Sequence, residues 1–536
     1  MKKSTLLGYS ILTGLLLVVA WPVFWFALLL FIAWVPLLII ANNVTKKLHF
    51  FGYTFLSVLI WNIGTTYWMW NSTDVGSVAA IIANSLLMCV PWLFYFTAAQ
   101  KNKNIGFITL IVSWLTFEYI HLNWQISWPW LTLGNGFAMH TSVIQWYEYT
   151  GVAGGSLWIL LMNILVFKLV LAKKEKQPIK KNIVQIVSFF IVPVVCSNLI
   201  LSYQKTQANT NSKNATSTQN VLVVQPNIDP YQKFEISSAS SQIAALINAT
   251  ESNMDSSTTL VLWPETAMSV ADWQDNITTN PYYQPIFEFS KRHPRLNILS
   301  GIETYKKYGA TKETPTAKQS SDGSFYYDAF NAAVYINNGT PLAFYNKSKL
   351  VPGVETLPTF LNFLGPVLEQ FGGSTGGYGK SKEAEVFTNN GCAYISAPII
   401  CYESIYGAYV GTYKQKSANL LAIITNDGWW GNTSGHKQHL QYATLRAIET
   451  RTWVARSANT GISAVIDPLG NIVAQKGWDE RAVIKYPIPT KSTLTFYAKH
   501  GDWLYQIFSF FVYCCSYFSK NRPLTLTKLS TSRGNN

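Results

Sequence analysis

The chain has 536 residues, enough for more than one domain, and a formal net charge of +14. It is 49% hydrophobic and only 13% charged, whereas soluble domains are about 25% charged, which argues against an ordinary soluble protein. Aromatic residues make up 15% of the chain and include 20 Trp, a composition typical of membrane proteins because Trp and Tyr favour the bilayer interface.

Repeated apolar runs fill the first 203 residues of the chain. Most of them approach the roughly 20 residues that a helix needs to cross a bilayer. The first run is followed closely by a second, with no small-residue cleavage site, so we do not expect a signal peptide. The predicted spans are 4–20, 23–41, 50–69, 77–98, 105–122, 143–172 and 183–203.

Lysines occur in every second loop between these runs. The loops 71–77 and 123–142 contain no Lys or Arg, so the positive-inside rule predicts a cytoplasmic N-terminus and seven crossings. Much of the positive charge is then explained by the orientation of the chain in the membrane, which weakens the interpretation that the protein binds nucleic acid. The basic loops hold Lys46 and Lys47, Lys101 and Lys103, and the lysines of 173–181.

The remaining chain is predicted to return once through the membrane. Residues 204–220 are polar and rich in Asn, Thr and Ser, and are predicted to be a linker. We expect domain boundaries at 1–203 for a seven-helix membrane domain, 221–500 for an extracytoplasmic domain and 501–519 for an eighth crossing. The basic tail 520–536 would be cytoplasmic.

Residues 221–500 have the pattern of an α/β domain. Helix-compatible segments, 236–256 and 437–456, separate several strand-like runs. Two hairpins are predicted, 331–347 around Asn-Gly and 461–476 around Asp-Pro-Leu-Gly. Strands that alternate with helices and hairpins favour a layered α/β architecture. The predicted strands lie in 220–228, 258–265, 296–303, 396–403 and 420–427.

Three strand-like runs end in residues that could act together, Glu265, Lys347 and Cys401. A free thiol is mostly protonated at neutral pH, and a carboxylate can remove its proton. A Lys ammonium can stabilise the thiolate and then an oxyanion, with the N–H of Tyr402 as a second donor. The predicted chemistry is acyl transfer through a thioester. Each residue alone is more often a capping Glu, a snorkelling Lys or an inert buried Cys.

Four motifs in this order resemble the nitrilase superfamily. Together with the apolar spans on either side, they resemble the bacterial apolipoprotein N-acyltransferases over nearly the full chain. The resemblance implies an αββα sandwich on the periplasmic face of the cytoplasmic membrane. The motifs are LWPET (262–266), YNKSKLVPGVE (345–355), ICYES (400–404) and TNDGWWG (425–431), with SWPWLTLGNG (127–136) and HLQYATLRAIE (439–449) in support.

The resemblance implies roles for six residues. Glu265 would be the general base, Lys347 the stabiliser of thiolate and oxyanion, and Cys401 the nucleophile. The family's supporting residues match Glu355, Tyr402 and Glu403. Three positions depart from the family pattern: Lys349 replaces a frequent His, Gly-Val-Glu (353–355) replaces Phe-Gly-Glu, and Phe234 stands where relatives carry a substrate-contacting Trp.

The implied reaction needs no cofactor and no metal. An acyl chain would pass from a phospholipid, with phosphatidylethanolamine the expected donor, to Cys401. It would then pass to the α-amino group of a diacylglyceryl-cysteine at the N-terminus of an apolipoprotein. A site that excludes bulk water is expected, since the amine competes with water for the thioester. We expect a monomer that binds no nucleic acid.

Two other functions remain as alternatives. A membrane-anchored nitrilase-like amidase would hydrolyse a small amide. A transporter would need paired charges or broken helices near the midplane, and the nearly charge-free spans argue against it. The segment GGSTGGYGKS (372–381) resembles a phosphate loop but has Ser374 where that motif needs Gly.

Four further features stay open on sequence alone. Residues 362–385 could form a substrate lid or a plain surface loop. A disulfide between Cys392 and Cys401 is compatible with their spacing. Glu118 lies within or at the end of an apolar span, where acidic residues are candidates for function. His436 and His439 have too few neighbouring ligands to predict a metal site.

Overall fold

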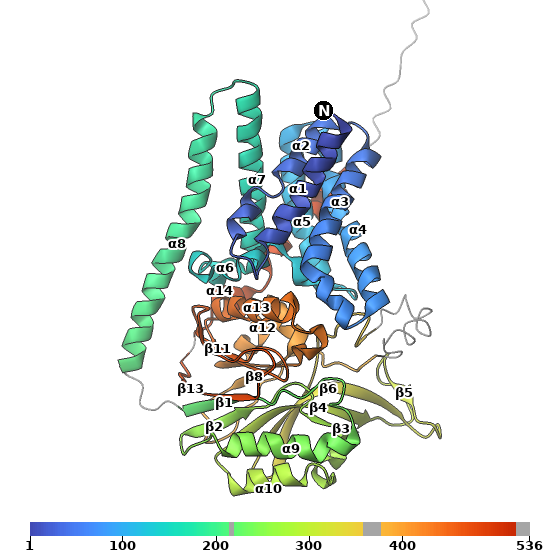
Figure 1. Ribbon diagram of the computed structural model, residues 1–536, viewed down its shortest axis with the longest axis vertical. Coiled ribbons are helices and arrows are strands. Elements are labelled where there is room, and N and C mark those ends of the chain that lie inside the picture. Colours follow the sequence, from blue (N-terminus) through green and yellow to red (C-terminus); the bar gives the residue numbers. More distant parts are fainter. Residues whose placement is uncertain (214–218, 357–376, 492, 521–536) are drawn as a thin grey trace, which may run out of the picture.

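The computed structural model describes residues 1–213, 219–356, 377–491 and 493–520, with side chains described except in 208–213, 236 and 513–520. A bundle of apolar helices stands on an α/β domain (Figure 1). The helices and turns of the bundle are α1 (Lys3–Ala20), η1 (Ala27–Phe31), α2 (Val35–Asn43), α3 (Lys47–Thr66), η2 (Tyr67–Asn71), α4 (Asp74–Ala99), α5 (Lys103–Asn123), η3 (Pro129–Leu131), η4 (Leu133–Phe137), η5 (Thr141–Val143), α6 (Tyr147–Thr150), α7 (Val152–Lys174) and α8 (Lys180–Lys213).

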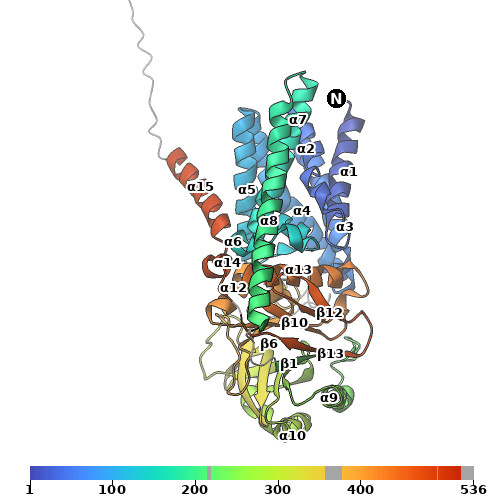
Figure 2. The same ribbon diagram turned by 90° about the vertical axis from the view of Figure 1, so that its left-hand side faces the viewer.

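Within the described residues, five helices are long and apolar enough to cross a membrane. These helices confirm five of the predicted spans, whereas the total of eight crossings stays a prediction. The α3 helix is of similar length but less apolar. The helix α15 (Trp503–Lys520) packs against α5 at its start, where the Tyr505 hydroxyl donates to Glu118 at 2.8 Å, and it points away from the α/β domain (Figure 2). The five are Lys3–Ala20, Asp74–Ala99, Lys103–Asn123, Val152–Lys174 and Lys180–Gln207.

One predicted span was wrong as a continuous helix, and a second, confirmed span starts later than predicted. The span 23–41 is broken into η1 and α2, and Pro36 lies at the start of α2, where its missing N–H costs nothing. The span 143–172 begins only at Val152, because Gly151 before it adopts φ +58 and ends α6. A side chain at Gly151 would collide with the ring of Tyr497.

The linker 204–220 stays a prediction; within it, α8 continues to Lys213 and strand β1 begins at Gln219. A polar sequence does not prevent a helix, since the backbone bonds of a helix are internal and Gln and Lys have good helix propensity. Near this end of the helix, the side chain of Gln204 donates to Glu148 at 3.3 Å.

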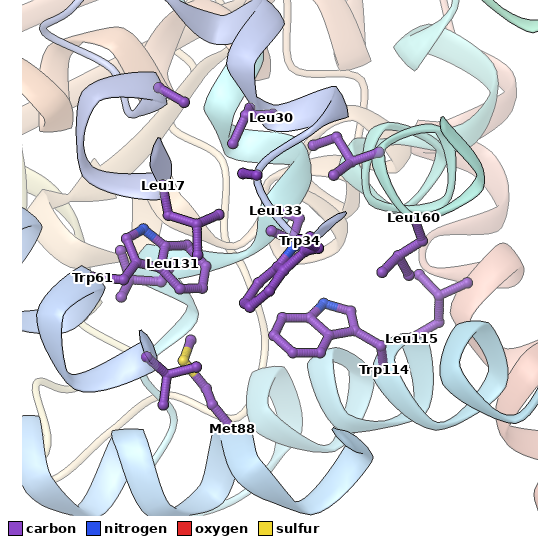
Figure 3. Packing of buried hydrophobic residues seen from close by; sticks show 14 of the residues in the cluster. Leu17, Leu30, Trp34, Trp61, Met88, Trp114, Leu115, Leu131, Leu133 and Leu160 are labelled. Atoms are coloured by element: carbon purple, nitrogen blue, oxygen red, sulfur yellow. The ribbon is translucent and has the colours of Figure 1, made fainter. Parts of the chain in front are cut away.

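Four tryptophans that meet edge-on or at a tilt form the centre of the helical bundle. The ring of Trp34 lies 5.8 Å from Trp61, 5.0 Å from Trp92 and 5.4 Å from Trp114, and all four are buried. Leucines surround this group (Figure 3). Rings at such offsets add about 0.5–1.5 kcal/mol per pair beyond the area that they bury. The tryptophans of this chain therefore also pack in the interior of the bundle, in addition to their expected place at the bilayer interface.

The α/β domain contains two sheets. One has the order β13-β1-β2-β4-β6-β5, with β3 on β4 and β7 on β6, and the other has the order β12-β11-β10-β9-β8. The elements are β1 (Gln219–Gln225), α9 (Ile236–Glu251), β2 (Thr258–Leu262), β3 (Met268–Trp273), η6 (Gln274–Thr279), α10 (Gln284–Arg292), β4 (Asn297–Lys307), β5 (Lys318–Gln319), β6 (Tyr326–Asn337), β7 (Thr340–Asn346), β8 (Ser396–Ile400), η8 (Cys401–Ile405), α12 (Gly407–Gln415), β9 (Leu420–Thr425), η9 (Asp427–Trp430), α13 (Ser434–Thr450), β10 (Trp453–Ala458), β11 (Ala464–Ile466), β12 (Ile472–Gln475), β13 (Ala482–Ile488) and α14 (Phe496–His500).

The layers follow from alternation along the strands. In β1, Val221 and Val223 belong to the core between the sheets, whereas Leu222 and Val224 pack under α9 and α10. Such alternation is the mark of a strand covered on both faces. The helices α12 and α13 cover the second sheet on the side of the bundle (Figure 1). The layered α/β prediction, the αββα order and both hairpins are confirmed.

The helix α13 joins the α/β domain to the bundle. Its Gln438 accepts a hydrogen bond from the Trp130 indole at 2.6 Å. Its Tyr442 donates to the Trp130 carbonyl at 2.9 Å and accepts from Trp21 at 3.0 Å. Just after α13, buried Arg451 donates to Glu148 at 2.5 Å. Hydrogen bonds rather than apolar packing alone therefore fix how the two halves meet.

Replacement of Arg451 by Met should lower the melting temperature of the purified protein markedly. The side chain of Arg451 also donates to Gln145 at 2.6 Å, and its loss leaves Glu148 buried without its cation. Breaking such a pair costs about 3–5 kcal/mol. The matched control is Arg292→Met, which removes an exposed pair with Glu251. An equal shift in both variants would contradict this account of the interface.

Candidate active site

The three predicted catalytic residues follow three different strands and meet in one place. Glu265 lies in the turn after β2, Lys347 directly follows β7, and Cys401 directly follows β8. All three are buried. The Lys347 ammonium donates to Glu265 at 3.1 Å and to Glu355 at 2.8 Å. Strand ends from both sheets thus deliver a thiol, an ammonium and two carboxylates to a single site.

Further hydrogen bonds hold the carboxylate of Glu265. Its Oε1 accepts from the Asn331 side chain at 2.8 Å, and its Oε2 accepts from the N–H of Asn426 at 3.0 Å. Asn331 also donates to Glu355 at 3.1 Å, so both carboxylates share an amide as well as Lys347. Sequence reasoning missed Asn331, because it lies mid-strand on β6 and no local pattern marks it.

Burial and the neighbouring charges have opposing effects on the pKa values of Lys347 and Cys401. Burial by itself would lower the pKa of the Lys347 ammonium, but the carboxylates of Glu265 and Glu355 outweigh burial and hold that pKa well above its usual range. Burial raises the pKa of the Cys401 thiol, the charge of Glu265 raises it further, and Lys347 acts in the opposite sense. The resting thiol is therefore protonated, and a reaction at sulfur needs a base beside it.

The backbone turns sharply at the thiol. The predicted strand 396–403 ends at Ile400, and Cys401 opens η8 with φ +49, the left-handed region that side chains rarely adopt. Such strain persists only where surrounding contacts enforce it, and it is common at functional sites. The turn points Cys401 out of the strand direction, which a continuing strand would not do.

Glu403 enforces this turn. Its Oε2 accepts from the N–H of Ile400 at 2.8 Å, and its Oε1 accepts from the N–H of Ser348 at 2.6 Å and of Lys349 at 3.2 Å. The hydroxyl of Tyr345 adds a further bond to Oε1 at 2.6 Å. The predicted supporting carboxylate therefore ties the turn at Cys401 to the segment that carries Lys347.

A network of hydrogen-bonded, buried polar side chains contacts the backbone at Cys401. His439 lies 3.2 Å from the Cys401 carbonyl, 2.9 Å from the Ser404 hydroxyl and 3.0 Å from Asp427. Arg456 donates to Asp427 at 2.6 Å. Sequence reasoning considered His439 only as a metal ligand. Among the described residues, no group of three or more His, Cys, Asp or Glu side chains could hold a metal ion.

Other predicted residues have defined places. The Tyr402 hydroxyl donates to the Ser127 carbonyl of the bundle at 2.8 Å. Glu118 is buried and accepts bonds at 2.9 Å from Trp114, 2.8 Å from Leu133 and 2.8 Å from Tyr505, so it joins three segments of the bundle side.

The remaining open features are partly resolved. Cys392 and Cys401 are both free, so the disulfide left open by their spacing does not form. Phe234 is 43% exposed. Of the proposed lid 362–385, residues 362–376 lie outside the part of the chain that the structure describes.

Two family profiles match the chain. Residues 221–495 match the carbon-nitrogen hydrolase profile, which defines the class of the α/β domain and its site. Residues 13–165 match the N-terminal domain of apolipoprotein N-acyltransferase. The apolipoprotein N-acyltransferase of Chlorobaculum tepidum is 31% identical over 510 residues, which is 92% of each chain. The chain therefore belongs to the apolipoprotein N-acyltransferase family.

Other relatives are more distant. The apolipoprotein N-acyltransferase of Rickettsia bellii is 26% identical over 89% of each chain. A solved nitrilase-superfamily amidase from Nesterenkonia AN1 is 15% identical, and the match covers 55% of this chain and 98% of the amidase with a TM-score of 0.34. A likeness at that level says nothing about activity.

Replacement of Glu403 by Gln should lower both the melting temperature and the rate at which Cys401 is acylated. Both carboxylate oxygens accept from backbone N–H groups, so the amide places a donor against a donor whichever way it turns. An unsatisfied buried group costs about 1–3 kcal/mol. Glu383→Gln, at a carboxylate that is 77% exposed, is the control. Unchanged acylation by the Glu403 variant would refute the positioning role.

Proposed function

We propose that this chain is an acyltransferase in lipoprotein maturation, with Glu265, Lys347 and Cys401 as its catalytic residues. It moves a fatty acyl chain from a phospholipid, phosphatidylethanolamine being the expected donor, to the α-amino group of an N-terminal diacylglyceryl-cysteine of an apolipoprotein. The observation that carries the proposal is the buried Lys347 held between two carboxylates beside Cys401, in a chain of this family.

In the first step, the Cys401 sulfur attacks the ester carbonyl of the phospholipid while Glu265 takes the thiol proton. The ammonium of Lys347 and the N–H of Tyr402 stabilise the oxyanion that forms. The bond between carbonyl carbon and ester oxygen then breaks, and Glu265 returns the proton to the departing oxygen. A lysophospholipid leaves, and the acyl chain remains as a thioester on Cys401.

In the second step, the free amine of the apolipoprotein attacks the thioester. Glu265 takes a proton from the amine, the carbon–sulfur bond breaks, and Glu265 passes that proton to the departing sulfur, so Cys401 is regenerated as a thiol with an amide as product. Burial of all three catalytic side chains supports transfer over hydrolysis, because water must be kept from the thioester. Glu355 and Glu403 act here by positioning Lys347 and the turn at Cys401.

We further propose that the chain works as a monomer in a bacterial cytoplasmic membrane. Eight crossings, with both termini in the cytoplasm and the α/β domain on the periplasmic face, follow from the alternating lysine loops. The domain lies at one end of the apolar helices, which supports access to donor and acceptor lipids (Figure 1). The amidase alternative is not favoured, because relatives across both halves of the chain are apolipoprotein N-acyltransferases.

Incubation with phosphatidylethanolamine should add the mass of one acyl chain to the purified protein, on Cys401. The Cys401→Ala variant should show no added mass, whereas the Cys392→Ala control should acylate normally because that thiol lies outside the site. Intact and peptide mass spectrometry measure both. A hydroxylamine-labile acyl group on another residue of the Cys401→Ala protein would show that the nucleophile is misassigned.

Replacement of Glu265 by Gln should slow acylation about 10²- to 10⁴-fold near neutral pH, since general base catalysis is lost. The remaining rate should rise about tenfold per pH unit, because only the thiolate reacts and burial keeps the pKa of Cys401 above its usual range. Single-turnover acylation across a pH series tests this expectation. A variant whose rate is as flat with pH as the wild type would argue against Glu265 as the base.

A further inference from the structure

A small cavity lies where the α/β domain meets the helical bundle. Its volume is about 30 Å³, which is room for roughly two water-sized groups. Its walls come from the end of α5, from η3 and η4, from the first residue of α7, and from η8, α12 and α14. The side chains that matter below are Asn123, Lys349, Tyr406, Tyr409 and Asp502.

Lys349 is the only cation among the described residues that line this cavity. Its ammonium lies 5.1 Å from the ring centroid of Tyr406 and 5.5 Å from that of Tyr409. Within the described chain, no hydrogen bond or ion pair reaches this ammonium. Asp502, on the same cavity, accepts instead from the Tyr497 hydroxyl at 2.8 Å. Among the described residues that line the cavity, the cation of Lys349 therefore faces two aromatic rings, and the one carboxylate, Asp502, already accepts from Tyr497.

The surroundings of Lys349 favour an anionic ligand. Burial lowers the pKa of its ammonium, the neighbouring charge of Lys380 lowers it further, and the weaker charges of Glu403 and Asp502 act in the opposite sense without outweighing them. An anion in the cavity would reverse both effects, because it compensates desolvation and shields the two cations from each other. The backbone N–H of Lys349 donates to Glu403 at 3.2 Å, which holds the backbone that carries this side chain beside the cavity.

The cavity also lies at the depth of lipid headgroups. Leu122 and Asn123 end α5, and Val152 begins α7, so the cavity is level with the ends of apolar helices. Headgroups occupy that level of a bilayer. Lys349 follows catalytic Lys347 by two residues, so their Cα atoms are at most about 7 Å apart. In a phospholipid, the phosphate and the first acyl ester are separated only by the glycerol.

We propose that Lys349 binds the phosphate of the phospholipid donor and thereby places an acyl ester at Cys401. This inference rests on the proposed function. The cavity accommodates the two non-bridging phosphate oxygens, and the tyrosine rings hold the ammonium above them. A lysine ammonium supplies the full positive charge that pairs with a phosphate diester near pH 7.

The test compares two acyl donors in single-turnover acylation of the full-length protein. Phosphatidylethanolamine carries the phosphate, and p-nitrophenyl palmitate does not. Lys349→Met should raise the half-saturating concentration of phosphatidylethanolamine at least tenfold, with little change in the limiting rate or with the phosphate-free ester. Lys349→Arg should restore binding, because it keeps the charge. Lys382→Met, at an exposed lysine away from the cavity, should match the wild type.

Several outcomes would overturn the phosphate site. If Lys349→Met slowed acylation equally with both donors, Lys349 would have a structural role. If the variant acylated like the wild type with both donors, Lys349 would have no role in donor binding. Inorganic phosphate should compete only weakly, because it brings no acyl chains. Strong competition would make the cavity a site for free phosphate. Failure of the wild type to form a thioester with either donor would instead refute the proposed function itself.

Discussion

The buried ammonium of Lys347 is the interaction on which the site depends. An unpaired ammonium at 1% side-chain exposure would be very costly, and two carboxylates at 2.8 and 3.1 Å offset that cost. The same contacts leave Glu265 beside the thiol and Glu355 behind the lysine. A buried pair of this kind adds little net stability, but it fixes positions. Here it fixes a carboxylate and an ammonium whose charges act on the Cys401 thiol.

A second constraint is the way the bundle meets the α/β domain. The helix α13 contacts the bundle through Gln438 and Tyr442, and through His439 it also reaches the carbonyl of Cys401. The ring of Trp130, from the bundle, lies 5.9 Å from that His439. The membrane half is therefore in contact with the support of the nucleophile, and it does more than anchor a soluble enzyme.

Local patterns predicted much of the fold and placed Glu265, Lys347 and Cys401 at the ends of strands. Apolar runs marked helices such as α4 and α5, and alternation with turn residues marked the hairpin around Asn-Gly. These predictions succeeded because burial and turn geometry depend on neighbouring residues. One predicted span is broken before Pro36 and another starts only after Gly151, since one such residue can end a helix inside an apolar run.

By itself, the sequence determined which strands end in Glu265, Lys347 and Cys401, because each motif is local. Only the tertiary structure decided that Asn331 joins both carboxylates, that Cys401 adopts a left-handed backbone, and that Lys349 faces a cavity beneath the bundle. These features depend on the stacking of two sheets and on contacts between residues far apart in the chain. No local pattern encodes such distances, because packing of the whole domain sets them.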